Sequence, residues 1–440
     1  MYQNLLQAFQ SLATPRVLVV GDLILDRYTT GDAGRISQES PVIVLRAGEH
    51  QSRLGGAANV ANMLRGLEAK VSIAGAVGDD EAGVEMLDKL RAAGCDAECI
   101  VRDVTRPTTV KHRFVGRAAS RHPSQILRVD TESTEALPGE IEDELARRIT
   151  DQIGAHNIVV ISDYDKGVCS QRLLRTIIHA AREAGVPVLV DPQRGGDWSK
   201  YRGCTLLKPN RIETESAVGQ KIQNTRDAIA AGTILCRQLG AMLAVITLDR
   251  DGMALVGEDG EGALFPIEAR SVYDITGAGD MVIAMLACCL GSNLTASDAV
   301  QLANVAAGLE VERIGVAVIP KEDISRELQA RSQPGGQKVS SVDAVAKVAE
   351  ECRRRGKRVV FTNGCFDLLH VGHVTYLAQA KAMGDVLIVG INSDDGVRRL
   401  KGPTRPVINE KDRAAMLAAM AAVDHVVVFD EDTPHNLLHA

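Results

Sequence analysis

Residues 274–280 read Asp-Ile-Thr-Gly-Ala-Gly-Asp, and an apolar stretch from Met281 to Leu290 follows them. Small residues ahead of a helix let backbone N–H groups point at an anion, and the helix dipole favours negative charge there. Asp280 is expected in the first turn of this helix, where a carboxylate can accept a proton from an attacking hydroxyl. The stretch therefore predicts a site that transfers an anionic group. The alternative interpretation is an ordinary helix N-cap with an acidic first turn.

Two other segments place polar groups where an open α/β sheet binds its ligands. Asp22 closes a predicted first strand, and the carboxyl ends of parallel strands form the ligand-binding edge of such a sheet. Gly55 and Gly56 precede an Ala-rich helix that contains Asn59, so the backbone can approach a ligand and the amide can bind its hydroxyl groups. A tight helix–sheet contact explains the two glycines equally well. Together the segments suit a polyhydroxylated ligand.

A candidate nucleotide-binding turn runs from Thr247 to Gly252 and includes Asp249. It follows a predicted buried strand, although an ordinary strand–turn has the same composition. The chain contains no Gly-x-x-x-x-Gly-Lys-[Ser/Thr] motif, so a P-loop is excluded. If this part of the chain binds a nucleotide, the turn and residues 274–280 are the segments expected to hold it.

Cationic residues recur near the predicted strand ends of the first half of the chain. Lys111 and Arg113 lie in one run, and Lys166 lies in an Asp-Tyr-Asp-Lys-Gly turn after the predicted strand Ile158–Ser162. Surplus cations suit an anionic sugar phosphate better than a neutral sugar. Each residue by itself is more often a solvated surface charge, so the prediction depends on their grouping.

The fold class follows from the alternation of short β-branched runs with Ala- and Leu-rich helical stretches. The clearest predicted strands are Val17–Val20, Ile158–Ser162, Val186–Val190, Ala244–Leu248, Val359–Thr362 and Val386–Ile391. Predicted helices between them include Gln171–Gly185 and Thr225–Gly240. Continuous apolar strands that alternate with helices predict a parallel sheet with both faces covered. The mixed, polar stretch Thr29–Arg53 predicts a small lid sheet instead.

Length and composition bound the number of domains and the kinds of partner. The chain has 440 residues, and a polar stretch with Pro-Gly-Gly after residue 332 indicates a linker. We expect a first domain over residues 1–330, a linker over 331–345 and a second domain over 346–440. A net charge of −7 and 3% aromatic residues argue against nucleic acid as a partner.

Cysteine usage and hydropathy predict a cytoplasmic protein. No apolar run approaches the ~18 residues of a membrane span, and the amino-terminal residues lack the pattern of a secretory signal, so no membrane partner is expected. The nine cysteines are scattered and contain no Cys-x-x-Cys pair. They are therefore expected to be reduced thiols, mostly in the core, and not zinc ligands.

A second candidate site lies in residues 359–373, which read VVFTNGCFDLLHVGH. A predicted buried strand ends before His370-Val-Gly-His373, and residues three apart share a face at the start of a helix. Both imidazoles can therefore donate to a phosphate at the helix N-terminus, and Gly372 permits close approach of a nucleotide. A metal-binding pair or a chance spacing is the alternative. The pattern favours nucleotidyl transfer.

The motifs of the first domain resemble the ribokinase-like (PfkB) carbohydrate kinase family over about residues 10–318. The resemblance implies that Asp280 is the base and that ATP and Mg²⁺ are used, with Mg²⁺ near Asn210 and Glu213. The nucleotide is then expected to contact Asn210, Glu213, Thr247, Asp249, Gly252, Thr276, Gly277, Ala278 and Gly279. The sugar is expected to contact Asp22, Gly55, Gly56, Asn59, Lys111, Arg113 and Lys166.

The second domain resembles the cytidylyltransferase-like nucleotidyltransferase superfamily, which carries a His-x-Gly-His motif. The resemblance implies catalytic roles for His370 and His373. The nucleotide is expected to contact Thr362, Gly364, Phe366, Lys401 and Arg405. Lys401 and Arg405 are cationic, and cations at such a position neutralise charge on a pyrophosphate leaving group.

The fusion of the two domains resembles the family of bifunctional enzymes that are both heptose 7-phosphate kinases and heptose 1-phosphate adenylyltransferases. This implies a ribokinase-like, doubly wound α/β sheet with a small β lid, followed by a truncated Rossmann-like nucleotidyltransferase domain. It also implies ADP-heptose synthesis for the lipopolysaccharide core. The alternatives are a kinase for another sugar phosphate or nucleoside fused to a transferase for another alcohol phosphate, and a non-catalytic ligand sensor.

Two further expectations follow from this resemblance. Relatives continue past the position of Ala440 with another strand and a Ser/Thr-rich helix start, so we expect adenylyl transfer to be impaired in this chain. Lid strands can pair between protomers by strand addition, so we expect a homodimer that forms through the first domain.

Overall fold

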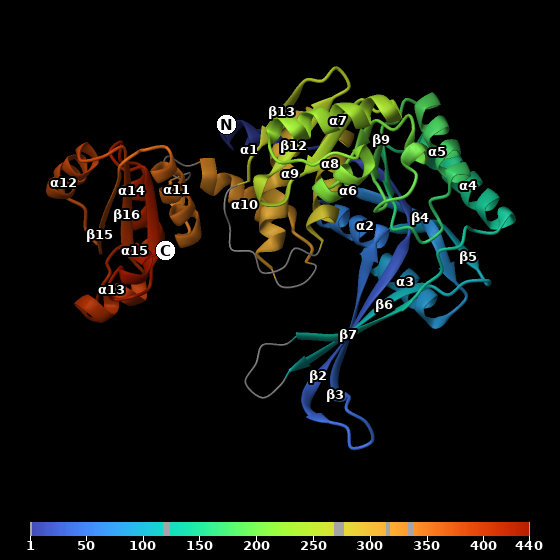
Figure 1. The fold of residues 1–440 in the computed structure, drawn as a ribbon, viewed down its shortest axis with the longest axis horizontal. Helices are drawn as coiled ribbons and strands as arrows, with labels where there is room; N and C mark the ends of the chain where they lie inside the picture. Colours follow the sequence, from blue (N-terminus) through green and yellow to red (C-terminus); the bar gives the residue numbers. More distant parts are fainter. Residues whose placement is uncertain (1, 118–123, 268–276, 314–316, 333–337, 440) are drawn as a thin grey trace.

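The computed structural model describes residues 2–117, 124–267, 277–313, 317–332 and 338–439. Figure 1 shows a large α/β domain with a protruding β lid, and a smaller α/β domain formed by the last hundred or so residues. The predicted strands of both domains are present, with ends that differ by at most two residues. One predicted site residue, Thr276, lies outside the described residues.

The large domain is built on a nine-stranded sheet of order β13-β12-β11-β10-β9-β8-β1-β4-β5. Its strands are β1 (Arg16–Gly21), β4 (Lys70–Gly78), β5 (Asp96–Asp103), β8 (Ile158–Ser162), β9 (Val188–Asp191), β10 (Leu206–Leu207), β11 (Leu243–Thr247), β12 (Met253–Gly257) and β13 (Gly262–Phe265). The neighbours from β11 to β5 are parallel, as predicted. The edge strands β12 and β13 are antiparallel, because the short turns before them allow hairpins and no crossover helix.

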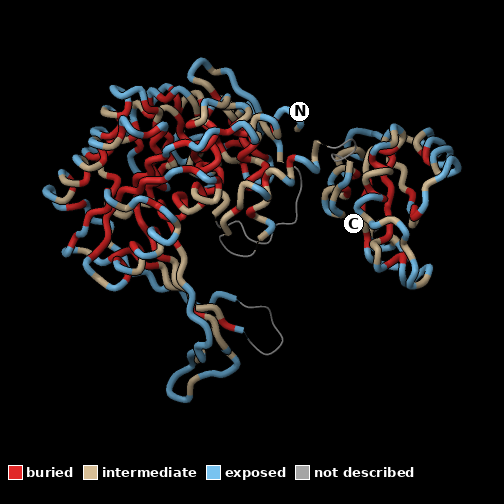
Figure 2. Tube along the Cα trace, turned by 180° about the vertical axis from the view of Figure 1, so that it is seen from behind, coloured by how far each residue is buried: buried red, intermediate tan, exposed pale blue. Residues whose placement is uncertain are grey.

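Helices cover both faces of this sheet, and its central strands are accordingly apolar and buried. They are α1 (Tyr2–Gln10), α2 (Ala57–Gly66), α3 (Glu81–Ala92), α4 (Gly139–Ile153), α5 (Gln171–Glu183), α6 (Arg211–Val218), α7 (Thr225–Leu239), α8 (Ala278–Gly291), α9 (Ala296–Val311) and α10 (Lys321–Ser332), with 3₁₀ turns at Trp198–Tyr201 and Asp249–Asp251. Along β1, Val17 and Val19 join one core cluster while Leu18 and Val20 join the other. Figure 2 shows buried residues throughout the interior of this domain.

The predicted lid is a four-stranded sheet of order β3-β2-β6-β7. It consists of β2 (Leu23–Ile36), β3 (Ile43–Gly56), β6 (Thr109–Arg117) and β7 (Ser124–Thr131). The lid begins earlier than residue 29, because β2 follows β1 after a single residue. Its far end is largely exposed, whereas the starts of β2 and β6 are buried against the large sheet (Figure 2).

The small domain has a four-stranded parallel sheet of order β14-β17-β16-β15. Its elements are β14 (Val339–Ser340), α11 (Val342–Arg354), β15 (Val359–Gly364), α12 (Val371–Ala382), β16 (Val386–Asn392), α13 (Asp394–Lys401), α14 (Glu410–Ala418), β17 (His425–Phe429) and α15 (His435–His439). β14 lies inside the segment 331–345 that was expected to be a linker, yet it pairs with β17. The paired part of the small domain therefore begins before residue 346.

Candidate functional site

A cleft lined mainly by the large domain, with a contribution from α11 of the small domain, gathers most of the predicted kinase residues. Those that line it are Gly55, Gly56, Asn59, Lys111, Arg113, Lys166, Asn210, Glu213, Thr247, Asp249, Gly252, Gly277, Ala278, Gly279 and Asp280. They come from the amino-terminal ends of α2, α6 and α8, from the lid strands and from the turns after β8 and β11. Because the carboxyl ends of parallel strands share one edge, residues far apart in sequence meet here.

Asp280 lies in the first turn of α8 and is 8% exposed. Gly277, in a left-handed conformation with φ of 97°, is the N-cap of this helix and offers no side-chain cap. Each carboxylate oxygen of Asp280 accepts one hydrogen bond, from Asn59 Nδ2 at 2.6 Å and from the Tyr164 hydroxyl at 2.8 Å. Burial raises the pKa of Asp280, while these two donors lower it. The carboxylate is thus held beside a helix N-terminus that favours an anion.

A buried ion pair lies next to this carboxylate. Lys208 Nζ is 3.0 Å from Asp191 Oδ1, and both groups line the cleft. Burial raises the pKa of Asp191 to about 7, although Lys208 opposes the shift. A methyl group at Gly279 would lie 3.5 Å from Lys208 Nζ, so the ammonium is next to the start of α8. This cation can neutralise charge on a phosphate bound there.

Asn210 and Glu213 form a reciprocal capping box at the start of α6. The side chain of Asn210 accepts from the Glu213 N–H at 2.9 Å, and Glu213 Oε2 accepts from the Asn210 N–H at 2.8 Å. Within the described residues Glu213 Oε1 has no hydrogen-bond partner. Glu213 Oε1, near Lys208, is therefore available to a hydrated divalent cation, which prefers oxygen ligands.

Asp22, which is predicted to contact the sugar, does not line the cleft. Asp22 is 1% exposed. Its carboxylate accepts from the backbone N–H groups of Tyr164, Lys166 and Val168, at 2.8, 3.1 and 3.2 Å. The strand-end rule locates the correct edge of the sheet, but this side chain turns into the loop after β8. Burial, with Asp163 nearby, raises its pKa to about 6.

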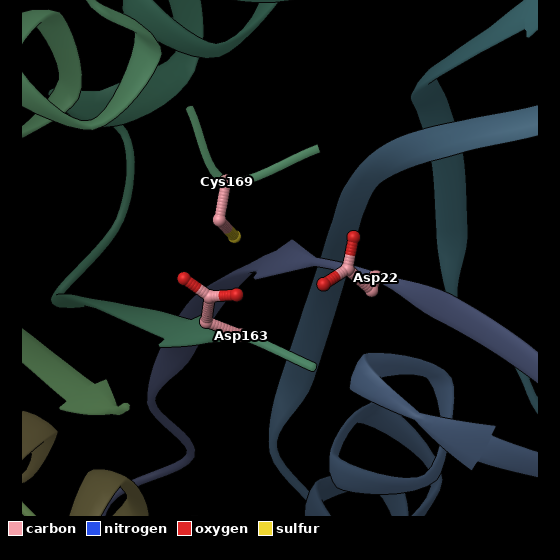
Figure 3. A group of neighbouring side chains, drawn as sticks. All are labelled: Asp22, Asp163 and Cys169. Carbon is pink, nitrogen blue, oxygen red and sulfur yellow. The ribbon is translucent and has the colours of Figure 1, made fainter. Parts of the chain in front are cut away.

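Asp22, Asp163 and Cys169 form a group of three side chains of the kinds that bind metal ions, and Figure 3 shows all three. The Asp163 carboxylate already accepts from the Tyr201 hydroxyl at 2.7 Å and pairs with Lys200 Nζ at 2.6 Å. Burial raises the pKa of the Cys169 thiol well above its usual value. With its oxygens bonded and its thiol protonated, the group acts as an anchor for the loop after β8.

The cations of the cleft differ in whether a carboxylate already neutralises them. Arg113 forms an ion pair with Asp26 across the lid strands, and Lys166 Nζ is 2.9 Å from Glu132. Lys111 Nζ instead lies over the Tyr164 ring, 5.5 Å from its centroid, and burial lowers its pKa. Lys111 is therefore the predicted sugar-site cation with the least local neutralisation.

Several charged residues that line the cleft were missing from the sequence-based site, among them Asp26, Asp191 and Lys208. Asp26 lies four residues beyond Asp22 on β2, Asp191 ends β9, and Lys208 precedes the predicted Asn210. The strand-end rule that selected Asp22 applies equally to Asp191. The sequence around Asp26 does not indicate a place in the cleft, because the bend that takes the chain from β1 into the lid depends on the tertiary structure.

The cleft also has an apolar end, where the side chains of Met253, Ala307 and Val311 line it. Asn304 on α9 lies in the same wall and donates to the Phe265 carbonyl at 3.0 Å. Its Oδ1 is buried and has no hydrogen-bond partner among the residues that the structure describes. An apolar wall with one spare acceptor suits a flat heterocycle that carries an amino group.

In the small domain the two predicted histidines meet at the start of α12. His370 Nδ1 accepts from the Gly372 N–H at 3.1 Å, and His373 Nδ1 accepts from the His370 N–H at 3.4 Å. The ring centroids are 4.0 Å apart. Both Nδ1 atoms accept from backbone N–H groups. In the described part of the chain neither Nε2 atom has a hydrogen-bond partner, so both are available to a ligand. Burial, His370 and Lys401 together lower the pKa of His373.

The other predicted nucleotide contacts lie in different environments. Phe366 is 6% exposed and its ring centroid lies 5.3 Å from that of His373, so it supports the imidazole. Thr362 is hydrogen-bonded to the Tyr376 hydroxyl at 2.5 Å. Arg405 is 2.6 Å from the buried Asp367, so its guanidinium is partly neutralised. A methyl group at Gly364 would lie 3.0 Å from the Phe366 ring.

Among the described residues, no helix combines the length and the apolar character that crossing a bilayer requires.

Two family models match the chain. Residues 14–323 match the pfkB family of carbohydrate kinases, and residues 361–440 match the cytidylyltransferase-like family. Solved structures agree with the first match. Arabidopsis thaliana ribokinase complexed with ribose and ATP has a TM-score of 0.56 and 21% identity, covering 72% of this chain and 99% of that one. Escherichia coli phosphofructokinase-2 in complex with fructose-6-phosphate has a TM-score of 0.60 and 19% identity, covering 72% and 100%. At this identity they show the fold.

Curated relatives match nearly the whole chain. The bifunctional protein HldE of Geobacter metallireducens is 43% identical over 436 residues, which are 99% of this chain and 88% of that protein. The HldE protein of Campylobacter curvus is 43% identical over 423 residues, covering 96% and 88%. Since both the order of the domains and this level of identity are shared, the chain belongs to the family of bifunctional HldE proteins, with a pfkB-type carbohydrate kinase domain followed by a cytidylyltransferase-like domain.

Proposed function

We propose that the large domain uses ATP to phosphorylate the C1 hydroxyl of D-glycero-β-D-manno-heptose 7-phosphate. The product is the 1,7-bisphosphate. After a separate phosphatase has removed its 7-phosphate, the small domain transfers AMP from ATP to the resulting heptose 1-phosphate, which gives ADP-heptose for the lipopolysaccharide core. The observation that carries the kinase assignment is the Asp280 carboxylate, fixed by two donors at the N-terminus of α8 inside a cleft lined by cations.

In the kinase step the C1 hydroxyl oxygen attacks the γ-phosphorus of ATP, and ADP leaves. Asp280 accepts the hydroxyl proton, as a general base of raised pKa does most effectively near neutral pH. Gly277, Ala278 and Gly279 surround the transferred phosphoryl group, and Lys208 neutralises the charge on it. Lys111 and Arg113 would hold the 7-phosphate of the sugar.

Mg²⁺ fits the donor set around Asn210 and Glu213, because Glu213 Oε1 is available and neighbouring positions can be filled by water. When bound, Mg²⁺ supplies positive charge to the phosphates of ATP. The adenine ring is placed at the apolar end of the cleft, where Asn304 Oδ1 would accept from its amino group.

In the second step a phosphate oxygen of heptose 1-phosphate attacks the α-phosphorus of ATP, and pyrophosphate leaves. His370 and His373 donate from Nε2 to the phosphates, since each Nδ1 is bonded to the backbone. Lys401 and Arg405 would stabilise the leaving pyrophosphate.

The test is a substrate panel with wild-type protein and Asp280→Asn. ADP formation is measured with heptose 7-phosphate, ribose 5-phosphate and fructose 6-phosphate, and pyrophosphate release is measured with heptose 1-phosphate. We expect turnover of heptose 7-phosphate by wild type and a fall of about 10²–10⁴-fold in kcat for Asp280→Asn. Turnover of another sugar phosphate in place of the heptose would contradict the substrate assignment.

We further propose that the protein is a cytoplasmic homodimer, paired through the lid. Several apolar lid side chains are exposed, including Ile36, Ile43 and Leu127, at 68%, 54% and 55%. Exposed apolar groups on the strands of an open sheet favour association with another copy of the same sheet.

A further inference from the structure

Tyr164 connects the base to the loop that follows β8. Its hydroxyl donates to Asp280 Oδ1 at 2.8 Å, while Asn59 occupies the other carboxylate oxygen. The proposed mechanism gives this phenol no role. Yet a carboxylate with one donor on each oxygen has a fixed rotamer, and its remaining lone pairs have fixed directions.

The direction of this hydrogen bond follows from the surroundings of the phenol. Burial and the nearby Asp280 charge raise the pKa of Tyr164 well above its usual value, so the phenol keeps its proton. Only the phenol can then donate, and the ionised carboxylate accepts. A donor of this kind stabilises the charged form of a carboxyl group, which is the form a general base requires.

Tyr164 is itself held by the backbone. Its N–H donates to Asp22 Oδ2 at 2.8 Å, and two further N–H groups of the same loop bind that carboxylate. Lys111 Nζ lies over the ring at 5.5 Å. Removal of the hydroxyl alone therefore leaves the ring in place.

We infer that Tyr164 is a positioning residue for the kinase step, which keeps the Asp280 carboxylate ionised and aimed at the attacking sugar hydroxyl. This inference rests on the proposed role of Asp280 as the base. It assigns the loop after β8 a part in catalysis in addition to its part in lining the sugar site.

Other charged groups also face Asp280 and must be accounted for. Lys208 lowers its pKa, whereas Asp26 raises it. Asp191 lies close enough for Asp280 to raise the Asp191 pKa. All three groups, and the amide of Asn59, remain unchanged when Tyr164 becomes Phe. A change in the pH profile of that variant therefore reports on the phenol.

The experiment compares wild type with Tyr164→Phe in the full chain, by measuring ADP formation from pH 5 to pH 9. Loss of a hydrogen bond to a charged group predicts a fall of about 10- to 100-fold in kcat, with KM for both substrates changed by less than about twofold. The base works deprotonated, so activity is lost as pH falls through its pKa. Because the phenol lowers that pKa, the acid limb of the variant moves to higher pH.

Tyr201→Phe is the matched control. It removes a buried phenol that donates to a different carboxylate, Asp163, at 2.7 Å. We expect a lower unfolding temperature with the acid limb and kcat retained. A Tyr164→Phe variant with wild-type kcat and acid limb overturns the inference. So does an equal loss of kcat in both variants with unmoved acid limbs, which indicates a merely structural role.

The sugar phosphate used is whichever member of the panel the wild type turns over. A wrong sugar assignment then leaves the comparison intact and affects the proposed substrate alone. A wild type that phosphorylates none of them contradicts the proposed function and this inference together.

Discussion

Lys401 lies near enough to His373 to take part in lowering the pKa of that imidazole, together with burial and His370. Replacement of Lys401 by Gln removes a positive charge that disfavours the imidazolium. We therefore expect the pKa of His373 to rise in Lys401→Gln. Histidine ring signals followed by NMR against pH measure this directly and do not depend on turnover.

The control for this titration is Lys381→Gln. Lys381 belongs to the same domain but is paired with Asp424 at 2.5 Å. If both variants leave the His373 titration where it is in wild type, Lys401 does not act on the histidine pair, and its predicted place beside the triphosphate is lost.

At the scale of elements, the junction between β3 and α2 depends on two adjacent glycines with different neighbours. Gly56 has a φ of 56°, and a methyl group there would lie 2.5 Å from the Asp22 carbonyl oxygen. A methyl group at Gly55 would overlap the carboxylate of Asp26, which is a mobile side chain. A backbone carbonyl cannot move away from a new methyl group as a side chain can. Substitution of Gly56 and substitution of Gly55 by alanine therefore have different consequences.

We expect Gly56→Ala to lower the free energy of unfolding by about 1–3 kcal/mol. Gly55→Ala is expected to leave stability nearly unchanged and to raise KM for the sugar phosphate, because it displaces Asp26 and its partner Arg113. Denaturant unfolding and steady-state kinetics on both variants check this. Equal loss of stability in the two variants would refute the distinction.

The loops around the second site are held by one buried side chain, Arg413, which is 0% exposed. Its guanidinium donates to the carbonyls of Ile408 and Cys365, at 2.9 and 2.6 Å, and pairs with Asp394 at 2.7 Å. The planar guanidinium group makes these three contacts at once through its N–H donors, and the single ammonium group of a lysine cannot replace it.

Arg413→Met leaves the partly exposed carboxylate of Asp394 and two carbonyls without the guanidinium as a partner. We expect it to destabilise the small domain by about 3–5 kcal/mol while the kinase kcat stays unchanged. Calorimetry and the ADP assay on the full chain measure the two effects. Arg413→Lys, which keeps the charge but loses the guanidinium, is expected to be intermediate. A small domain that unfolds as in wild type would show that these bonds contribute little.

At the scale of the whole molecule, the homodimer is tested by charge placed on the lid. Ile43→Asp combined with Leu127→Asp puts two carboxylates on the exposed apolar surface of β3 and β7. Burying them at an interface costs far more than leaving them in water. We expect sedimentation equilibrium to give twice the chain mass for wild type and the single mass for this variant.

Val104→Asp serves as the control, because Val104 is 79% exposed and lies outside the lid. It is expected to sediment like wild type. A wild type that sediments as a single chain at micromolar concentration would exclude the homodimer. Dissociation caused equally by both variants would exclude the lid as its interface.

Local patterns were sufficient for the architecture and for the centres of both sites. Apolar strands predict a sheet covered on both faces, and the start of α8 with Asp280 can be identified from seven consecutive residues. The histidine spacing of α12 is equally local. In each case the physics acts within one helix turn or one strand, so neighbouring residues carry the information.

The surroundings of those centres were decided by the tertiary structure. Asn59 and Tyr164 reach Asp280 from 221 and 116 residues away, through the packing of α2 and the loop after β8. Asp22 illustrates the same limit, since its place at a strand end was predictable but the direction of its side chain was not. Hydrogen bonds between distant elements depend on how those elements pack, and hydrophobic periodicity encodes which face is buried without specifying the polar partner that meets it.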